Sequence, residues 1–135
     1  MGRYLLDSNA FLWAKETPKI LRSGAREIVE DPQNTLFVSA VGLWELADKA
    51  SKGKLPEFAA IMDRLPGGLE AALTESGIQL LSLETAHIAH FYRLPFHHRD
   101  PFDRLMIAQA QVEGLTMISR DAAFQGYSGL KIVTA

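Results

Sequence analysis

Short apolar runs alternate along this chain with longer stretches whose apolar residues recur every three or four positions. The short runs predict buried β-strands, and the three-to-four spacing predicts helices with one buried face. Strands are expected at residues 4–6, 36–38, 78–83, 116–118 and 130–133. Helices are expected through residues 11–13 and at 18–29, 40–52, 58–65, 69–73, 85–92, 101–112 and 122–124.

Breaker residues separate these segments. Asp31-Pro32-Gln33-Asn34 and Pro66-Gly67-Gly68 interrupt the periodic pattern, and Gly53 and Gly114 stand where helix C-terminal caps are expected. Apolar strands that alternate with helices favour a parallel sheet covered on both faces. We therefore predict a single domain over residues 1–135, an α/β fold with three α/β/α layers and a mostly parallel central sheet of four to five strands.

Composition narrows the classes of function. A length of 135 residues fits one domain, and no run approaches the about 18 consecutive apolar residues of a membrane span. The first residues lead straight into a strand pattern without a signal sequence, so a cytoplasmic protein is expected. The absence of cysteine excludes disulfides and thiolate chemistry. A formal net charge of −2 gives no general attraction for nucleic acid, so any such contact must use local patches.

Four carboxylates stand where a predicted strand meets a helix or just inside the following helix: Asp7, Glu45, Asp103 and Asp121. In a parallel sheet these positions share the carboxyl edge, where such folds build their sites. Carboxylates brought that close repel one another unless protons or a cation are present. Oxygen ligands suit Mg²⁺ or Mn²⁺, which can activate water and neutralise charge on a phosphodiester. Ser8 and Asn9 are candidate accessory residues that orient a ligand.

Each carboxylate also has a simpler explanation. Asp7 and Asp121 suit helix N-caps, and Glu45 suits a narrow solvent-facing stripe. Asp100 before Pro101 is the expected N-cap of the helix that carries Asp103, and this position makes it an accessory residue at the mouth of the pocket. The joint placement of all four residues at one sheet edge favours the metal pocket over separate caps.

Other residues suggest contacts with partners. His97, His98, Arg99 and Arg104 form a candidate basic rim for RNA phosphates beside the carboxylates, with a solvated loop as the alternative. His87 and His90 are expected to be ordinary helix-face residues. Large apolar residues are frequent on the early helices, where some are expected to form a groove for a partner helix: Phe11, Leu12, Trp13, Trp44, Phe58 and Met62.

Four segments of the sequence resemble the PIN-domain nucleases, and within them the VapC-type toxins of toxin–antitoxin pairs. These are LLDSNAFLW, SAVGLWEL, HHRDPFDRLMIAQA and ISRDAAFQGY, of which the third is the most specific. The resemblance implies that Asp7, Glu45, Asp103 and Asp121 bind Mg²⁺ or Mn²⁺ in an endoribonuclease. It also implies a homodimer and a small antitoxin that blocks the site. Asn9 departs from the family pattern, which often has His there.

Two rival functions stay open from the residues alone. A receiver or phosphatase-like phosphotransfer domain would use Asp7, but a phosphatase of this kind would need a second Asp where Asn9 stands. A receiver would need its acceptor Asp after the third strand, where the chain has Glu84. A catalytically inactive binding module with the same fold is the second rival, although all four acidic positions are filled.

Overall fold

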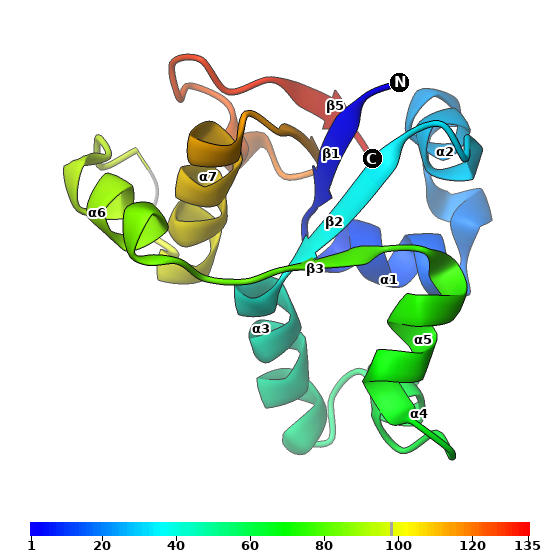
Figure 1. Cartoon of the computed structure of the whole chain (residues 1–135). Helices are drawn as coiled ribbons and strands as arrows, with labels where there is room; N and C mark the ends of the chain where they lie inside the picture. Colours follow the sequence, from blue (N-terminus) through cyan, green and yellow to red (C-terminus); the bar gives the residue numbers. More distant parts are fainter. Residues whose placement is uncertain (98) are drawn as a thin grey trace.

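In the computed structural model of the chain, which describes residues 1–97 and 99–135, five parallel strands form one sheet (Figure 1). The strand order is β3-β2-β1-β4-β5, and every pair is parallel. The strands are β1 Arg3–Leu6, β2 Thr35–Ser39, β3 Gln79–Leu81, β4 Thr116–Ser119 and β5 Ile132–Thr134. The predicted parallel sheet is confirmed, and the last strand is an edge strand.

Helices connect the strands and cover both faces of the sheet. The α-helices are α1 Ser8–Glu16, α2 Ser23–Glu30, α3 Ala40–Ser51, α4 Pro56–Met62, α5 Gly68–Ser76, α6 Thr85–Arg93 and α7 Pro101–Glu113, with short 3₁₀ turns η1 Pro18–Ile20 and η2 Ala122–Phe124. Figure 1 shows α6 and α7 on one side of the sheet and α1, α2, α4 and α5 on the other. The three-layer prediction is therefore confirmed.

Alternation along the central strand explains the two layers. Leu6 packs with residues of α1, α2, α4 and α5 in one apolar cluster, and Leu5 packs with residues of α7 and β4 in a second. Both side chains are fully buried. Because successive side chains of a strand point to opposite faces, these two adjacent leucines hold a helix layer on each side.

Several predicted boundaries differ from the structure. The helix expected over 18–29 is divided into η1 and α2, because the backbone at Leu21 is extended. The helix expected over 58–65 runs from Pro56 to Met62. The expected strand at 78–83 pairs only over Gln79–Leu81, and the fifth strand is displaced to Ile132–Thr134. The ends of helices and strands depend on strand pairing and on capping groups, and the hydropathy pattern alone does not reveal these partners.

The topology places one crevice in the sheet. From β1 the chain moves outward through β2 to β3, then crosses back to β4 on the other side of β1. The order therefore reverses between β1 and β4, and in open α/β sheets ligands bind beyond the carboxyl ends of the strands at such a point. Asp7 and Asp121 follow these two strands. No helix of the described residues is long and apolar enough to cross a membrane.

Candidate metal-dependent active site

One pocket of about 200 Å³ contains all the predicted acidic residues. It opens at the carboxyl edge of the sheet, between the starts of α1, α3 and α7 and the loop after β4. Its lining residues are Asp7, Ser8, Asn9, Trp13, Glu45, Lys49, Asp100, Asp103, Arg120, Asp121 and Phe124. Four segments that are distant in sequence thus meet in one place.

Asp7 is the most buried carboxylate of the pocket. Its Oδ1 accepts a hydrogen bond of 2.8 Å from the Ala10 N–H, which caps α1, and its Oδ2 accepts one of 2.5 Å from the Ser119 hydroxyl. Burial raises the pKa of the Asp7 carboxyl, and the charges of Asp121 and Glu45 add to the rise, while the two hydrogen bonds oppose it. Asp7 is therefore both an N-cap and a pocket carboxylate.

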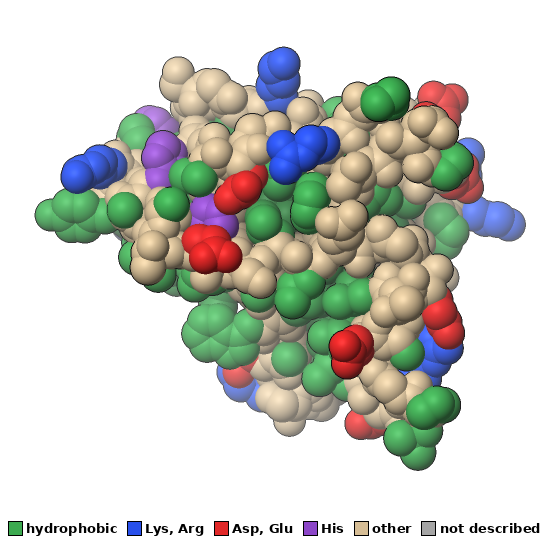
Figure 2. Space-filling view, viewed as in Figure 1, with side chains coloured by type: hydrophobic (Ala, Val, Ile, Leu, Met, Phe, Trp, Pro, Cys, Tyr) green, Lys and Arg blue, Asp and Glu red, His purple; other side chains and the backbone are tan. Residues whose placement is uncertain are grey.

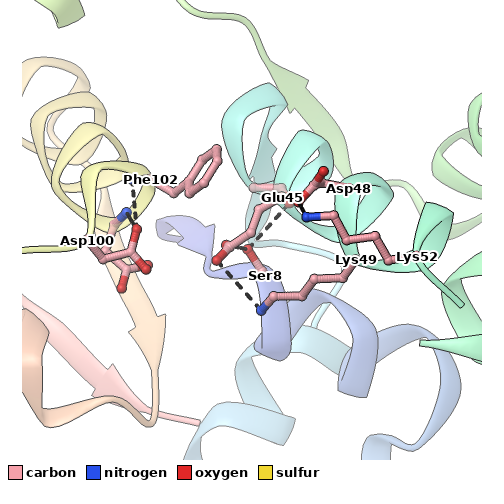
Figure 3. Close-up of polar contacts among 9 residues, drawn as sticks. Ser8, Glu45, Asp48, Lys49, Lys52, Asp100 and Phe102 are labelled. Carbon is pink, nitrogen blue, oxygen red and sulfur yellow. Dashed lines mark hydrogen bonds and ion pairs between the residues drawn. The ribbon is translucent and has the colours of Figure 1, made fainter. Parts of the chain in front are cut away.

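Glu45 extends from the second turn of α3 into the pocket. Its Oε1 accepts a 2.9 Å hydrogen bond from the Ser8 hydroxyl, and its Oε2 lies 3.7 Å from Lys49 Nζ (Figure 3). The Glu45 side chain is only 13% exposed. The solvent-facing stripe considered from the sequence is therefore wrong for this residue. Ser8, a predicted accessory residue, orients its carboxylate.

A close approach of α1 and α3 makes this contact possible. Gly42 lies one helical turn before Glu45, and a Cβ built there would stand 3.2 Å from Ser8 Oγ and 3.3 Å from Met106 Sδ. A larger residue would push the serine away from α3. The glycine therefore keeps the start of α1 within hydrogen-bonding distance of Glu45.

The N-terminus of α7 carries two of the three remaining acidic residues, Asp100 and Asp103. Asp100 accepts hydrogen bonds from the N–H groups of Phe102 at 2.9 Å and Asp103 at 3.4 Å, so it is the N-cap that the sequence predicts (Figure 3). Asp103 lies in the first turn of α7 and also lines the pocket. Asp121 caps η2 through a 2.9 Å bond from the Ala123 N–H and completes the acidic lining.

Carboxylate oxygens are the type of ligand that a hard divalent cation prefers. Within the described ranges, however, no group of three or more His, Asp or Glu side chains could hold a metal ion as the side chains stand. The Lys49 ammonium near Glu45 and the hydrogen bonds on Asp7 occupy carboxylate oxygens that a cation would need. The pocket therefore has the right type of ligand atoms for a metal ion. These side chains would have to move closer together to coordinate it.

Sequence reasoning did not assign three residues to this site, of which Lys49 and Arg120 line the pocket and Ser119 lies behind Asp7. Ser119 anchors Asp7, Lys49 pairs with Glu45, and Arg120 lines the pocket while its guanidinium lies 4.4 Å from the Trp13 ring centroid. Arg120 also donates to the backbone oxygens of Ala135 at 3.0 Å and Ile20 at 2.7 Å. Ser119 and Arg120 directly precede Asp121, so their position at the carboxyl end of the fourth strand was the available signal.

The predicted basic rim is only partly assembled. Arg104 is buried, with its guanidinium over the rings of Phe91 and Phe96, so it is not an exposed rim residue. His97 contacts the Tyr127 ring edge-to-face with ring centroids 5.0 Å apart, and Arg99 is exposed. His98 lies outside the described residues.

The two histidines of α6 take part in helix packing. His87 is fully buried, where its Nδ1 accepts from the Glu84 N–H at 2.9 Å and its Nε2 lies 2.8 Å from Glu113 Oε2. His90 contacts Gln111. The expectation of an ordinary helix-face position is wrong for His87, which joins α6 to α7. Glu84 forms the capping box of α6 with His87 and does not line the acidic pocket.

Comparisons with known proteins agree with this geometry. The family model for the PIN domain matches residues 4–130, while no curated protein matches the sequence. Among solved structures, VapBC2 from Rickettsia felis bound to promoter DNA is similar with a TM-score of 0.71 and 17% identity, covering 97% of each chain. DNA-bound VapBC from Salmonella typhimurium has a TM-score of 0.64 and 19% identity, covering 98% of each chain. A toxin–antitoxin complex from Klebsiella pneumoniae has a TM-score of 0.61 and 20% identity, covering 97% of this chain and 96% of that one.

Proposed function

Because the chain belongs to the PIN domain family, we propose that its acidic pocket is the active site of a divalent-metal-dependent endoribonuclease of the VapC toxin type. The observation that carries this proposal is the meeting of Asp7, Glu45, Asp103 and Asp121 in one pocket from four distant segments. Each of these residues could cap a helix or face solvent on its own. Their convergence at the β1–β4 crevice is what a shared ligand would require.

The residues that would hold Mg²⁺ or Mn²⁺ are Asp7, Glu45, Asp103 and Asp121, with Asp100 at the mouth. A cation bound there neutralises charge on the phosphodiester and lowers the pKa of a water molecule. Ser8 and Ser119 orient the carboxylates of Glu45 and Asp7 through their hydroxyl groups. Asn9 is exposed beside them and can orient a substrate group. Asp7 must be ionised to serve, so its raised pKa makes cation affinity increase with pH.

The substrate that we propose is single-stranded or looped RNA, because its phosphodiesters are accessible to one side of a small domain. The chain has no cysteine, and the described residues place no serine–histidine pair in the pocket. We therefore expect direct hydrolysis by water, without a covalent enzyme intermediate.

A cleavage assay in isotopically labelled water tests this chemistry. Oxygen-18 from the solvent should enter the product phosphate in one step when RNA is incubated with Mg²⁺ or Mn²⁺. Cyclic phosphate products without solvent oxygen would contradict direct hydrolysis. Incubation with acetyl phosphate should leave Asp7 unphosphorylated. A stable phosphoaspartate would favour the phosphotransfer domain instead.

We also propose a small antitoxin as partner. The solved structures that resemble this chain include VapBC complexes and a toxin–antitoxin complex, and an acidic pocket would attract an inserted Arg or Lys. Beside the pocket a hollow lined by Leu12, Trp13, Ile20 and Leu55 offers apolar surface for a partner helix. Of the six large apolar residues of which some were expected to form the groove, Phe11 and Phe58 are fully buried in the core instead, and Leu12 lines the hollow with only 8% of its surface exposed.

Co-expression tests the partner. A small protein encoded beside this gene should co-purify with the chain and suppress RNA cleavage. Trp13→Ala, which removes groove surface, should weaken the complex more than Met62→Ala at the far end of α4. A purified protein that is active and harmless in cells without any partner would contradict the toxin assignment and leave the nuclease assignment standing.

A homodimer is the remaining part of the proposal. A large, mostly apolar groove between α5, α3 and the outer edge of β3 is lined by Leu43, Leu69, Leu73, Ile78 and Leu80, among others. Leu80 is 50% exposed on the edge strand. An apolar surface of this kind marks an interaction site on most soluble proteins, and a second copy of the chain is the occupant that we propose.

A further inference from the structure

The side chain of Arg104 on α7 contacts two aromatic rings, and none of the three residues lines the acidic pocket. The Arg104 guanidinium is 4.6 Å from the Phe91 ring centroid and 4.7 Å from the Phe96 ring centroid, so it lies over both rings. Arg104 is buried and Phe91 is half-buried. Phe96, in contrast, is 70% exposed although it is a large apolar side chain.

Among the described residues, the buried Arg104 side chain is held by a backbone oxygen and two aromatic rings. Its Nη2 donates a 3.3 Å hydrogen bond to the Leu94 backbone oxygen, and its Nε has no hydrogen-bond partner among the described residues. Arg104 forms no salt bridge with any residue in the part of the chain that the structure describes. The two ring faces supply the main favourable environment for its charge. Arg104 therefore fixes the Phe96 ring from behind, while most of that side chain stays exposed.

The arginine that contacts the Phe96 ring adjoins two residues of the pocket. Arg104 directly follows Asp103, and its backbone N–H donates a 3.0 Å bond to the backbone oxygen of Asp100, so the start of α7 carries both the pocket carboxylates and the arginine that contacts Phe96. Arg93 and Arg99 are exposed in the same segment, and so is Tyr92. On the left of Figure 2, hydrophobic, basic and histidine side chains gather at the end of the molecule that α6 occupies.

We propose that Phe96 is a base-stacking subsite for the single-stranded RNA whose phosphodiester enters the acidic pocket. Exposed aromatic rings between cationic side chains are how proteins bind single strands, with bases on the rings and phosphates on the cations. A rigid ring loses little entropy on binding, and here Arg104 supplies the rigidity. Arg99 provides the nearby phosphate contact. The inference rests on the proposed ribonuclease function, and it adds the residue that positions a base beside the cleaved bond.

The test measures RNA binding separately from cleavage. All proteins carry Asp103→Asn so that the probe stays intact, and the probe is a fluorescein-labelled single-stranded RNA of 12 nucleotides and mixed sequence. Phe96→Ala and Phe96→Leu should each raise the Kd about 5- to 100-fold, the range expected for one lost stacked base. Phe96→Trp should restore tight binding. Met62→Ala, which removes another exposed apolar side chain on the opposite face of the sheet, should leave the Kd unchanged.

Two further readouts separate stacking from a structural role. Quenching of 2-aminopurine in the RNA should occur with Phe96 or Trp and disappear with Leu, while melting temperatures stay equal. Arg99→Ala should reduce the slope of log Kd against log salt by about 1, and Phe96→Leu should not change that slope.

Each result decides between the proposals. Equal RNA binding by the Phe96→Leu protein and its parent would overturn the subsite and leave the proposed nuclease standing. A parent protein that binds no RNA would overturn both. Loss of a co-purifying protein in Phe96→Leu, with RNA binding unchanged, would overturn the subsite and assign the ring to a protein interface.

Discussion

At the scale of single residues, the pocket carboxylates each have a second task. Asp7 and Asp121 satisfy helix N-termini, and Glu45 holds the Ser8 hydroxyl and the Lys49 ammonium. Asp7 and Asp121 are therefore the N-caps that the simpler interpretation predicts, and both also line the acidic pocket. A backbone N–H that points at the carboxylate helps to stabilise its charge before any cation arrives.

Asp7 should make the metal-free protein less stable as pH rises. Its folded pKa is raised above the unfolded value of about 3.9, so its favourable contribution is complete below that value and is lost as pH rises through the folded pKa. Asn is a comparable N-cap, so Asp7→Asn should keep the cap and remove this loss. In EDTA, urea unfolding should show the variant gaining on the wild type as pH rises above about 4, the unfolded pKa. Asp63→Asn, an exposed carboxylate, should show no such gain.

Lys49 should compete with a metal for Glu45. Its ammonium is 3.7 Å from Glu45 Oε2 within the pocket, so Lys49→Met should tighten Mg²⁺ binding by up to about fivefold, the value of one partly exposed ion pair. Lys52 offers a matched control, since it pairs with Asp48 at 3.0 Å on the same helix and does not line the pocket. Titration calorimetry would measure both. Equal Mg²⁺ affinity in the two variants would contradict competition between Lys49 and the metal for Glu45.

At the scale of elements, the acidic residues come from the segments that follow β1, β2 and β4 and from the start of α7. Helix α7 contributes through its first turn, where Asp100 caps the backbone and Asp103 lines the pocket three residues later. The two residues are close in sequence and chemically alike. Asp100 differs in that its carboxylate accepts the hydrogen bonds that cap α7.

Substitutions of Asp100 should separate its role as the N-cap of α7 from the role of its negative charge at the pocket mouth. Asp100→Ala removes the acceptor for two N–H groups and should cost about 1 kcal/mol of unfolding free energy. Asp100→Asn keeps the cap and should leave stability close to wild type. Both should reduce RNA cleavage without abolishing it, because the charge at the pocket mouth is lost in each. Denaturant unfolding and cleavage rates decide this, and a large stability loss in Asp100→Asn would argue against a simple cap.

At the scale of the whole molecule, hydropathy was enough to predict the order of the elements. Alternating strands and helices predicted a parallel sheet, and parallel pairing then brought the carboxyl ends, with Asp7 and Asp121, to one edge. Arg104 shows why the rest was not predictable. A basic residue next to Asp103 looks like a rim residue in the sequence, and only the positions of Phe91 and Phe96 reveal that it is buried.

The dimer proposal belongs at this scale as well. Leu80 is half exposed on the edge strand β3, beside the apolar groove, so Leu80→Asp should place a charge in the interface and yield a monomer. Light scattering after size-exclusion chromatography would measure the mass. Met62→Asp, at a similarly exposed apolar residue on α4, should leave the mass unchanged. A wild type that is monomeric at micromolar concentration would contradict the proposal.

The central claim is that four distant carboxylates form one cation site. The most direct measurement is the melting temperature with and without millimolar Mg²⁺ or Mn²⁺, in the wild type, in Asp7→Asn with Asp103→Asn, and in the Asp63→Asn control. A cation that binds only the folded protein at 100 times its Kd adds about 2.7 kcal/mol of stability. We expect the wild type and the control to melt several degrees higher with metal, and the double variant to show no shift. An unmoved wild-type curve, or an equal shift in the double variant, would contradict the claim.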